Sequence, residues 1–319
     1  MLAGRALSLT VAPGRARSLT LALVMASLCL TGAANAAAKP KCVGAAARDA
    51  KHPCFNPTRS VTPSLADADR VSTSPCNVVH EEPEPVCSFG VSAPRATQHI
   101  ALLGDSHALQ WRAPLDFAAT AQGWRGYSLT APGCPFSDAV KYLAEGPRGP
   151  CVEHNRAVLK WFRAHPEVTT VYTSHFAAVP FAAPGRTALE VKSAGFRRAW
   201  ASLPRTVKRV IVIRDPPVTT PSTVDCLRDA IAAATQRPGI ACRLPRLGTL
   251  FDDAAVTTAR QLRSRRHAVV DLTSYFCGQA YCYPVIGGVL VHRDATGHIT
   301  IAYSESLGPY LLRKLRLLG

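Results

Sequence analysis

Short apolar runs alternate with longer amphipathic stretches along the chain from residue 98 to its end. The runs are five to seven residues long and rich in Val, Ile, Leu and Thr, which is typical of buried strands. Strands are expected at 98–103, 126–130, 168–173, 207–213 and 267–272. Helices are expected near 107–121, 151–165, 189–202, 225–235, 252–265 and 305–317. This alternation predicts βαβ units, and hence an α/β fold with a mostly parallel sheet covered by helices on both faces.

The part of the chain before this pattern has a different composition. Residues 1–36 carry three arginines, an apolar stretch at 19–30 and a small-residue end, which together predict a secretory signal peptide. No later apolar stretch is longer, so no transmembrane segment is expected in the mature chain. Residues 37–95 are rich in Pro, Ser, Ala and acidic residues, with four cysteines and little periodicity. They predict a disulfide-pinned N-terminal segment on the edge of one domain at 96–319.

Ten of the eleven cysteines follow the predicted signal peptide. An even count in an exported protein predicts a disulfide framework, although the sequence alone does not choose among the many connectivities. Along the chain the cysteines fall into five short-range pairs, at 42–54, 76–87, 134–151, 226–242 and 277–282. A zinc site is the alternative, but there is no CxxC and the ten histidines show no ligand spacing around these cysteines. Neither a metal nor a cofactor is therefore expected.

The composition is strongly basic, with 37 Lys and Arg against 21 Asp and Glu and a formal net charge of +16. Without the predicted signal peptide the charge is +13, because three arginines and no acidic residue leave with it. A basic exported protein is drawn to polyanions such as cell-wall polymers, acidic polysaccharides or anionic lipid surfaces. A solvated basic surface that aids solubility is an equal alternative. Nucleic acid is not expected as a partner, because the chain has no basic and aromatic stacking motif.

The residues Gly104-Asp105-Ser106-His107 stand where the first predicted strand gives way to a helix. A serine at such a junction lies at the carboxyl edge of a parallel sheet, where α/β enzymes place their chemistry. Its backbone N–H lies at a helix N-terminus and suits a developing negative charge. Ser106 is therefore a candidate nucleophile, and the alternative is that it only caps the helix. Asp105 is expected to hydrogen-bond the turn, and His107 to have a substrate-facing or structural role.

An acid and a base lie together near the other end of the chain. Asp294 and His298 share one loop between a short apolar strand and the last predicted helix. A serine nucleophile needs a base that takes its proton and a carboxylate that holds the base in the correct tautomer. His298 is the candidate base and Asp294 the candidate carboxylate, provided that their loop lies beside Ser106.

The GDSH residues at 104–107, together with an Asp–His loop before the last helix, resemble the SGNH (GDSL-like) hydrolase superfamily. The closest likeness is to the extracytoplasmic SGNH domains attached to membrane acyltransferase-3 proteins. Supporting segments are Cys87-Ser-Phe-Gly, Pro132-Gly-Cys-Pro135, and residues 270–277 and 285–294. The likeness spans roughly residues 76 to 317. It implies a flavodoxin-like three-layer αβα sandwich with a five-stranded sheet, here stapled by disulfides.

The resemblance also implies a set of roles. Ser106 would attack an ester carbonyl and give its proton to His298, whose imidazole Asp294 orients. The backbone N–H groups of Ser106 and Gly133 would hold the charge on the carbonyl oxygen, although Pro-Gly-Cys-Pro is also a turn sequence in its own right. The family's asparagine is not visible after the third strand, so Ser174 or His175 would donate in its place. A histidine beside an aromatic residue is more often a packed one.

The Asp–His spacing departs from the family pattern. Three residues separate Asp294 from His298, where the superfamily usually has two. The longer loop contains Gly297 and can bulge there, and the alternative is that the additional residue moves Asp294 out of reach of the imidazole. Asp215 and Asp271, each near the end of a predicted strand, are reserve candidates for the acid.

These features predict an exported serine O-acyl (acetyl) esterase or O-acyltransferase, secreted or periplasmic, that acts through an acyl-enzyme. The resemblance implies that the substrate is an acylated carbohydrate or cell-envelope polymer, with a separate membrane acyltransferase as a further partner. A noncatalytic glycan-binding or wall-binding module on the same fold is the alternative. A basic scaffold that recruits a membrane acyltransferase is a third hypothesis.

Overall fold

The structure of the chain is a computed structural model. The structure describes residues 42–54, 56, 58–68, 76–79, 86–144, 146–181, 183, 185–234 and 237–318. All of them belong to one unit that spans Pro40–Gly319. The predicted signal peptide at 1–36 lies outside the described residues.

A parallel sheet of five strands forms the centre of this unit. Its strands are β3 (Gln98–Gly104), β4 (Trp124–Thr130), β5 (Val168–Ser174), β6 (Arg209–Ile213) and β8 (His267–Val270). They pair side by side in the order β4-β3-β5-β6-β8, and every pair is parallel. In chain order this is the 2-1-3-4-5 arrangement of flavodoxin-like folds. The predicted α/β class, the parallel strands and their order are confirmed.

Two further strands make the main sheet seven-stranded, so the predicted number of five is wrong. β2 (Val86–Gly90) pairs antiparallel with β4, and β1 (Asn77–Val79) pairs antiparallel with β2. Both come from the segment that showed little periodicity. No local pattern marks these two strands, which are defined by the pairing of β1 with β2 and of β2 with β4 and by the Cys76–Cys87 bridge.

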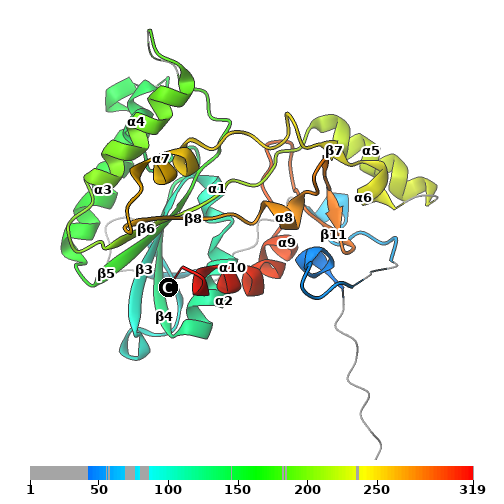
Figure 1. Cartoon of the computed structure of the whole chain (residues 1–319), viewed down its shortest axis with the longest axis horizontal. Coiled ribbons are helices and arrows are strands. Elements are labelled where there is room, and N and C mark those ends of the chain that lie inside the picture. Colours follow the sequence, from blue (N-terminus) through cyan, green and yellow to red (C-terminus); the bar gives the residue numbers. More distant parts are fainter. Residues whose placement is uncertain are drawn as a thin grey trace, which may run out of the picture. The chain divides into compact units, whose positions relative to one another are not determined.

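The two faces of the sheet are covered by different helices (Figure 1). On β3, Ile100 and Leu102 join the apolar cluster that includes α2 (Arg112–Gln122) and α10 (Gly308–Arg316). The alternate residues Ala101 and Leu103 point to the other face. That face is covered by α3 (Pro150–Ala164), α4 (Ala188–Ala201) and α7 (Ala254–Leu262). The result is a three-layer αβα sandwich.

Two predicted helices are each divided into two. The stretch 107–121 forms α1 (Ser106–Leu109) and α2, and the final stretch forms α9 (Ile301–Ser306) and α10. A proline stands in the first turn of each second helix, Pro114 in α2 and Pro309 in α10. Since Pro114 has no N–H, the Gln110 carbonyl is free to accept the Ser304 hydroxyl at 2.5 Å. This bond ties the helix start after Ser106 to the helix after His298.

Shorter elements complete the unit. The remaining helices are α5 (Pro221–Ala233), α6 (Pro238–Ala241) and α8 (Thr273–Phe276), with 3₁₀ turns η1 (Gly44–Arg48), η2 (Leu65–Asp67), η3 (Ala93–Arg95), η4 (Asp138–Tyr142) and η5 (Gly146–Arg148). Two small antiparallel ladders pair β7 (Leu244–Pro245) with β9 (Tyr281–Cys282), and β10 (Val285–Ile286) with β11 (Val289–Leu290). Among the described residues, no helix has the length and apolar character needed to cross a membrane.

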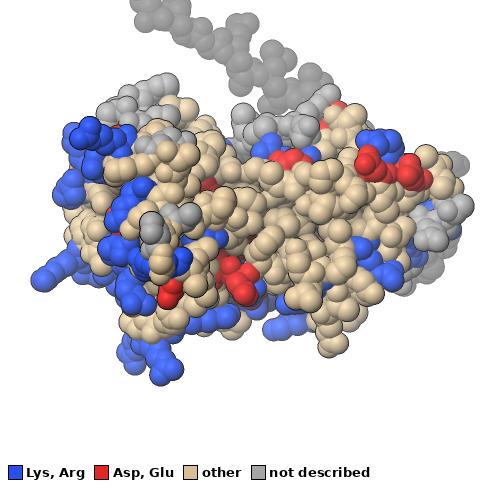
Figure 2. Space-filling model, turned by 90° about the horizontal axis from the view of Figure 1, so that it is seen from above, with Lys and Arg blue, Asp and Glu red and all other residues tan. Residues whose placement is uncertain are grey.

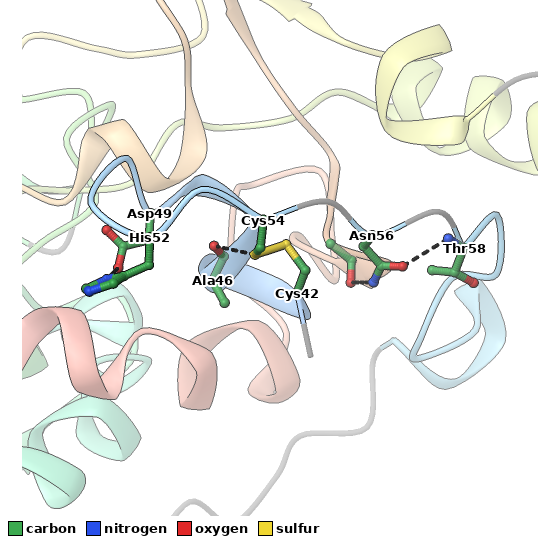
Figure 3. The surroundings of a disulfide bond; sticks show 8 residues. Cys42, Ala46, Asp49, His52, Cys54, Asn56 and Thr58 are labelled. Carbon is green, nitrogen blue, oxygen red and sulfur yellow. Dashed lines mark hydrogen bonds and ion pairs between the residues drawn. A yellow bond between two sulfur atoms is a disulfide. The ribbon is translucent and has the colours of Figure 1, made fainter. Parts of the chain in front are cut away.

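Five disulfides join the cysteines in the five short-range pairs along the chain. The first, Cys42–Cys54, closes the N-terminal segment around η1 (Figure 3). Two further contacts fasten this segment to the C-terminal helices. Asp49 accepts two hydrogen bonds of 3.0 Å from the guanidinium of Arg313, and the Ala45 N–H donates to the Ser306 hydroxyl at 3.0 Å.

Candidate active site

A tight turn at the end of β3 positions Ser106. Gly104 has φ +135°, and a Cβ at this position would lie 2.1 Å from the carbonyl oxygen of Ser174 on β5. Only glycine fits this approach of two backbones. Asp105 then caps α1 by accepting the His107 N–H at 2.9 Å, and its other oxygen accepts the Phe176 N–H at 2.9 Å. Ser106 is thereby held as the first residue of α1, at the carboxyl edge of the sheet.

The side chains of Ser106, His298 and Asp294 form a continuous hydrogen-bonded chain. His298 Nε2 lies 2.8 Å from Ser106 Oγ, and His298 Nδ1 lies 2.7 Å from Asp294 Oδ2. Residues 192 positions apart in the chain therefore meet at the sheet edge. Since the carboxylate accepts from Nδ1–H, the lone pair of Nε2 is directed at the serine hydroxyl.

The loop from Asp294 to His298 closes despite its additional residue. Gly297 has φ +91°, and a Cβ there would lie 2.9 Å from the Val218 Cα. This left-handed residue lets the chain bulge, so that the His298 imidazole still meets the carboxylate of Asp294. Thr296 donates to Asp294 Oδ1 through its N–H at 3.0 Å and through its hydroxyl at 2.6 Å.

The Asp294 carboxylate is held in its charged form. Burial acts to raise its pKa, but the hydrogen bonds from His298 and Thr296 outweigh burial and hold the pKa well below the ordinary value. The group is therefore ionised throughout the neutral and mildly acidic range. An ionised acceptor is what orients an imidazole and stabilises the imidazolium that forms when it takes a proton.

His292 supports the loop that carries Asp294 and His298. No sequence pattern indicated this residue as part of the site. It is buried, and its Nε2 donates to the Pro217 carbonyl at 2.7 Å. A bridge between His292 and Ile299 and a 2.8 Å bond from the Arg293 N–H to the His298 carbonyl close the base of the loop. Burial lowers the pKa of His292 to about 4, so the ring is neutral in the folded protein at pH 7.

This depressed pKa predicts a loss of stability in acid. As pH falls below about 6.5, the unfolded chain takes up a proton at His292 that the folded chain binds only near pH 4, so the free energy of unfolding falls. The contribution reaches about 3 kcal/mol across this window. We expect His292→Gln, which keeps a donor but cannot ionise, to lose less stability than the wild type between pH 7 and 4.5. Urea unfolding with the disulfides intact measures the difference, and parallel losses in both proteins would contradict it.

The candidate oxyanion donors other than Ser106 lie in three different environments. Ser174 ends β5 opposite Gly104, and its buried hydroxyl has no hydrogen-bond partner among the residues that the structure describes. His175 is buried against Phe196 of α4, with ring centroids 4.5 Å apart, so it faces the α4 and α7 layer. Gly133 lies in the open loop after β4, with φ +73°. Within the described part of the chain, no hydrogen bond joins these three residues to the Ser106 hydroxyl.

The two reserve acids are engaged elsewhere. Asp215 Oδ1 lies 2.7 Å from Nδ1 of His107, which makes a second buried His–Asp pair. Asp271 accepts the Thr273 N–H at 2.9 Å and a 3.3 Å bond from Arg214. Asp294 is therefore the carboxylate that contacts His298. No group of three or more His, Cys, Asp and Glu side chains is placed to hold a metal ion in the described part of the molecule.

The protein is a flavodoxin-like αβα sandwich. Its serine lies at the first strand-to-helix turn and is hydrogen-bonded to a C-terminal loop that carries a His and an Asp. These features are those of the class of SGNH-type α/β proteins. Residues 74–313 match the family described as the SGNH domain fused to AT3 domains, and the chain belongs to this family. Membership supports a role in acyl-ester hydrolysis or acyl transfer.

A solved structure shares the fold. The periplasmic domain of the lipopolysaccharide acetyltransferase of Salmonella ser. Paratyphi A superposes with a TM-score of 0.53. The match covers 72% of this chain and 89% of that one, at 12% sequence identity. No curated protein sequence matches the chain.

Proposed function

We propose that the protein is a serine O-acyl esterase or O-acyltransferase that acts on an acylated carbohydrate or cell-envelope glycan. The observation that carries this proposal is the chain of hydrogen bonds of 2.8 and 2.7 Å that links Ser106, His298 and Asp294. The acetyltransferase whose periplasmic domain shares the fold acts on lipopolysaccharide, which supports a small acyl group and a glycan.

The reaction has two halves. The Ser106 hydroxyl gives its proton to His298 Nε2 as its oxygen bonds the ester carbonyl carbon, and the collapse of the tetrahedral intermediate expels the alcohol, which takes that proton. Water or a sugar hydroxyl then repeats these steps on the acyl-enzyme and restores the serine. We assign the oxyanion to the backbone N–H of Ser106 and of Gly133, with Ser174 and His175 as further candidates. Loss of one such donor commonly costs about 10²–10³ in rate.

Three features support the proposed location of the protein and its proposed partners. Five disulfides are consistent with an extracytoplasmic location. The family accompanies membrane acyltransferase domains, so we infer that a separate membrane acyltransferase supplies or receives the acyl group. Lys and Arg side chains gather on the left of the view in Figure 2, where Figure 1 places α3 and α4, which suits an anionic polymer.

Trapping of the acyl-enzyme tests the proposal directly. After incubation with p-nitrophenyl acetate, mass spectrometry is expected to find one acetyl group on the peptide that contains Ser106. The label should be absent from Ser106→Ala and retained in Ser202→Ala, which removes an exposed hydroxyl on the far end of α4. Labelling that is the same in all three proteins would overturn the serine mechanism. Glycan binding without any label would favour a noncatalytic module.

A further inference from the structure

A second His–Asp pair lies beside the triad, and the mechanism above does not use it. His107 Nδ1 is 2.7 Å from Asp215 Oδ1, and the two side chains are 1% and 3% exposed. Asp215 follows β6, and its other oxygen accepts the Ala177 N–H at 2.8 Å. Its own N–H donates to Asp253, the N-cap of α7, at 3.1 Å. Asp215 thus joins α1 to the segment after β5 through its carboxylate, and to the start of α7 through its backbone N–H.

The His107 ring lies directly against the catalytic imidazole. Its centroid is 4.6 Å from that of His298 and 4.6 Å from that of Phe176. Its Nε2 is buried, and none of the described residues provides a hydrogen-bond partner for it. His107 therefore fills the space between the proposed base and the loop after β5, with one polar atom unsatisfied at the site.

The charges around His107 favour the imidazolium. Burial acts to lower its pKa, but Asp215, Asp105 and Asp294 together outweigh burial, and the pKa is raised above the ordinary value. The other titratable groups that face it are His298 and His292, which lie on the loop and strand end packed against it. The raised pKa therefore favours a positive charge on the ring that lies next to the His298 ring.

We propose that His107 and Asp215 act as a positioning pair for the reaction, in which the imidazolium of His107 braces the face of the His298 ring and balances the buried carboxylate of Asp215. This inference rests on the proposed function. If His107 is lost, an uncompensated carboxylate remains beside the base. That carboxylate favours the protonated, inactive form of His298, and the ring loses the packing surface that aims it at Ser106.

The test compares three variants by their pH–rate profiles with p-nitrophenyl acetate. For His107→Phe, which keeps an aromatic ring, we expect kcat to fall about 10–100-fold with KM within about twofold. The acidic limb of its profile should move up by about 0.5–1 pH unit. In the double variant His107→Phe/Asp215→Asn, which removes both charges, the limb should return to the wild-type position. His99→Phe, a matched control at the opposite end of β3, should match the wild type.

A purely structural pair would lower the rate without moving the acidic limb, and the double variant would not restore it, so either result overturns the inference. If the variants fail to fold, a measurement on the wild-type protein still tests the inference. A pH titration of the imidazole ¹⁵N signals should show that His107 keeps its second proton to a higher pH than an ordinary histidine, and a ring that loses this proton at or below the ordinary pH would equally reject the inference. Absence of Ser106-dependent turnover in the wild type would instead reject the proposed function, while the NMR result would still report on the pair.

Discussion

Ser106→Ala is expected to lower kcat/KM for p-nitrophenyl acetate by at least about 10³-fold. The hydroxyl is the only group that His298 Nε2 contacts at hydrogen-bond distance in the described part of the site. Without it, no acyl-enzyme forms, and the remaining rate reflects water attacking a bound ester. Release of p-nitrophenol by the purified protein measures the change.

The control is a serine that is buried in the same region but does not contact His298. The Ser304 hydroxyl donates to the Gln110 carbonyl at 2.5 Å, so Ser304→Ala removes a structural hydrogen bond between α9 and α1. It should cost about 1 kcal/mol of stability and leave most of the rate. Equal rates for the wild type and Ser106→Ala would exclude the serine mechanism, whatever the behaviour of Ser304→Ala.

Asp294→Asn should have the second large effect, a fall in kcat of about 10³–10⁴-fold. An asparagine amide at this position can donate to Nδ1, which stabilises the tautomer whose Nε2 carries the proton. That tautomer cannot accept the proton of Ser106. Because the pKa of Asp294 is held far below neutrality, the loss should be present throughout the range from about pH 5 to 9. Steady-state kinetics across this range measures it.

Asp271→Asn is the matched control for this substitution. Asp271 also follows a strand at the sheet edge, but it contacts Thr273 and Arg214 rather than a histidine. Its replacement should leave kcat within about twofold of the wild type. If the two substitutions had similar effects, the carboxylate assignment to Asp294 would be wrong.

Much of the fold was accessible from the sequence, because parallel strands are buried on both faces and read as continuous apolar runs. The run at 207–213 predicts β6 to within two residues. β1 and β2 escaped detection because their conformation depends on pairing, of β1 with β2 and of β2 with β4, which no local pattern encodes. The division of the helix after Ser106 follows from Pro114, whose position in a first turn is recognisable only once the helix boundary is known.

The residues of the site likewise divide into those that the sequence indicates and those that it does not. Ser106, His298 and Asp294 could be predicted as candidates because each lies in a short motif with its own local signature. The contact of His107 with Asp215 joins residues 108 positions apart, and neither residue carries a signal that indicates the other. His292 is also bound over distance, to a carbonyl 75 residues away. Groups that support a site from behind are chosen by tertiary packing, so sequence spacing does not reveal them.

The pattern of the disulfides has a consequence for biogenesis. The ten cysteines from Cys42 onward form disulfides in consecutive pairs along the chain, and no bridge encloses or crosses another. A polypeptide that crosses a membrane from its N-terminus onward exposes these cysteines to an oxidant one pair at a time. The order of emergence alone then selects the native partners, and maturation would require an oxidase but little reshuffling by an isomerase.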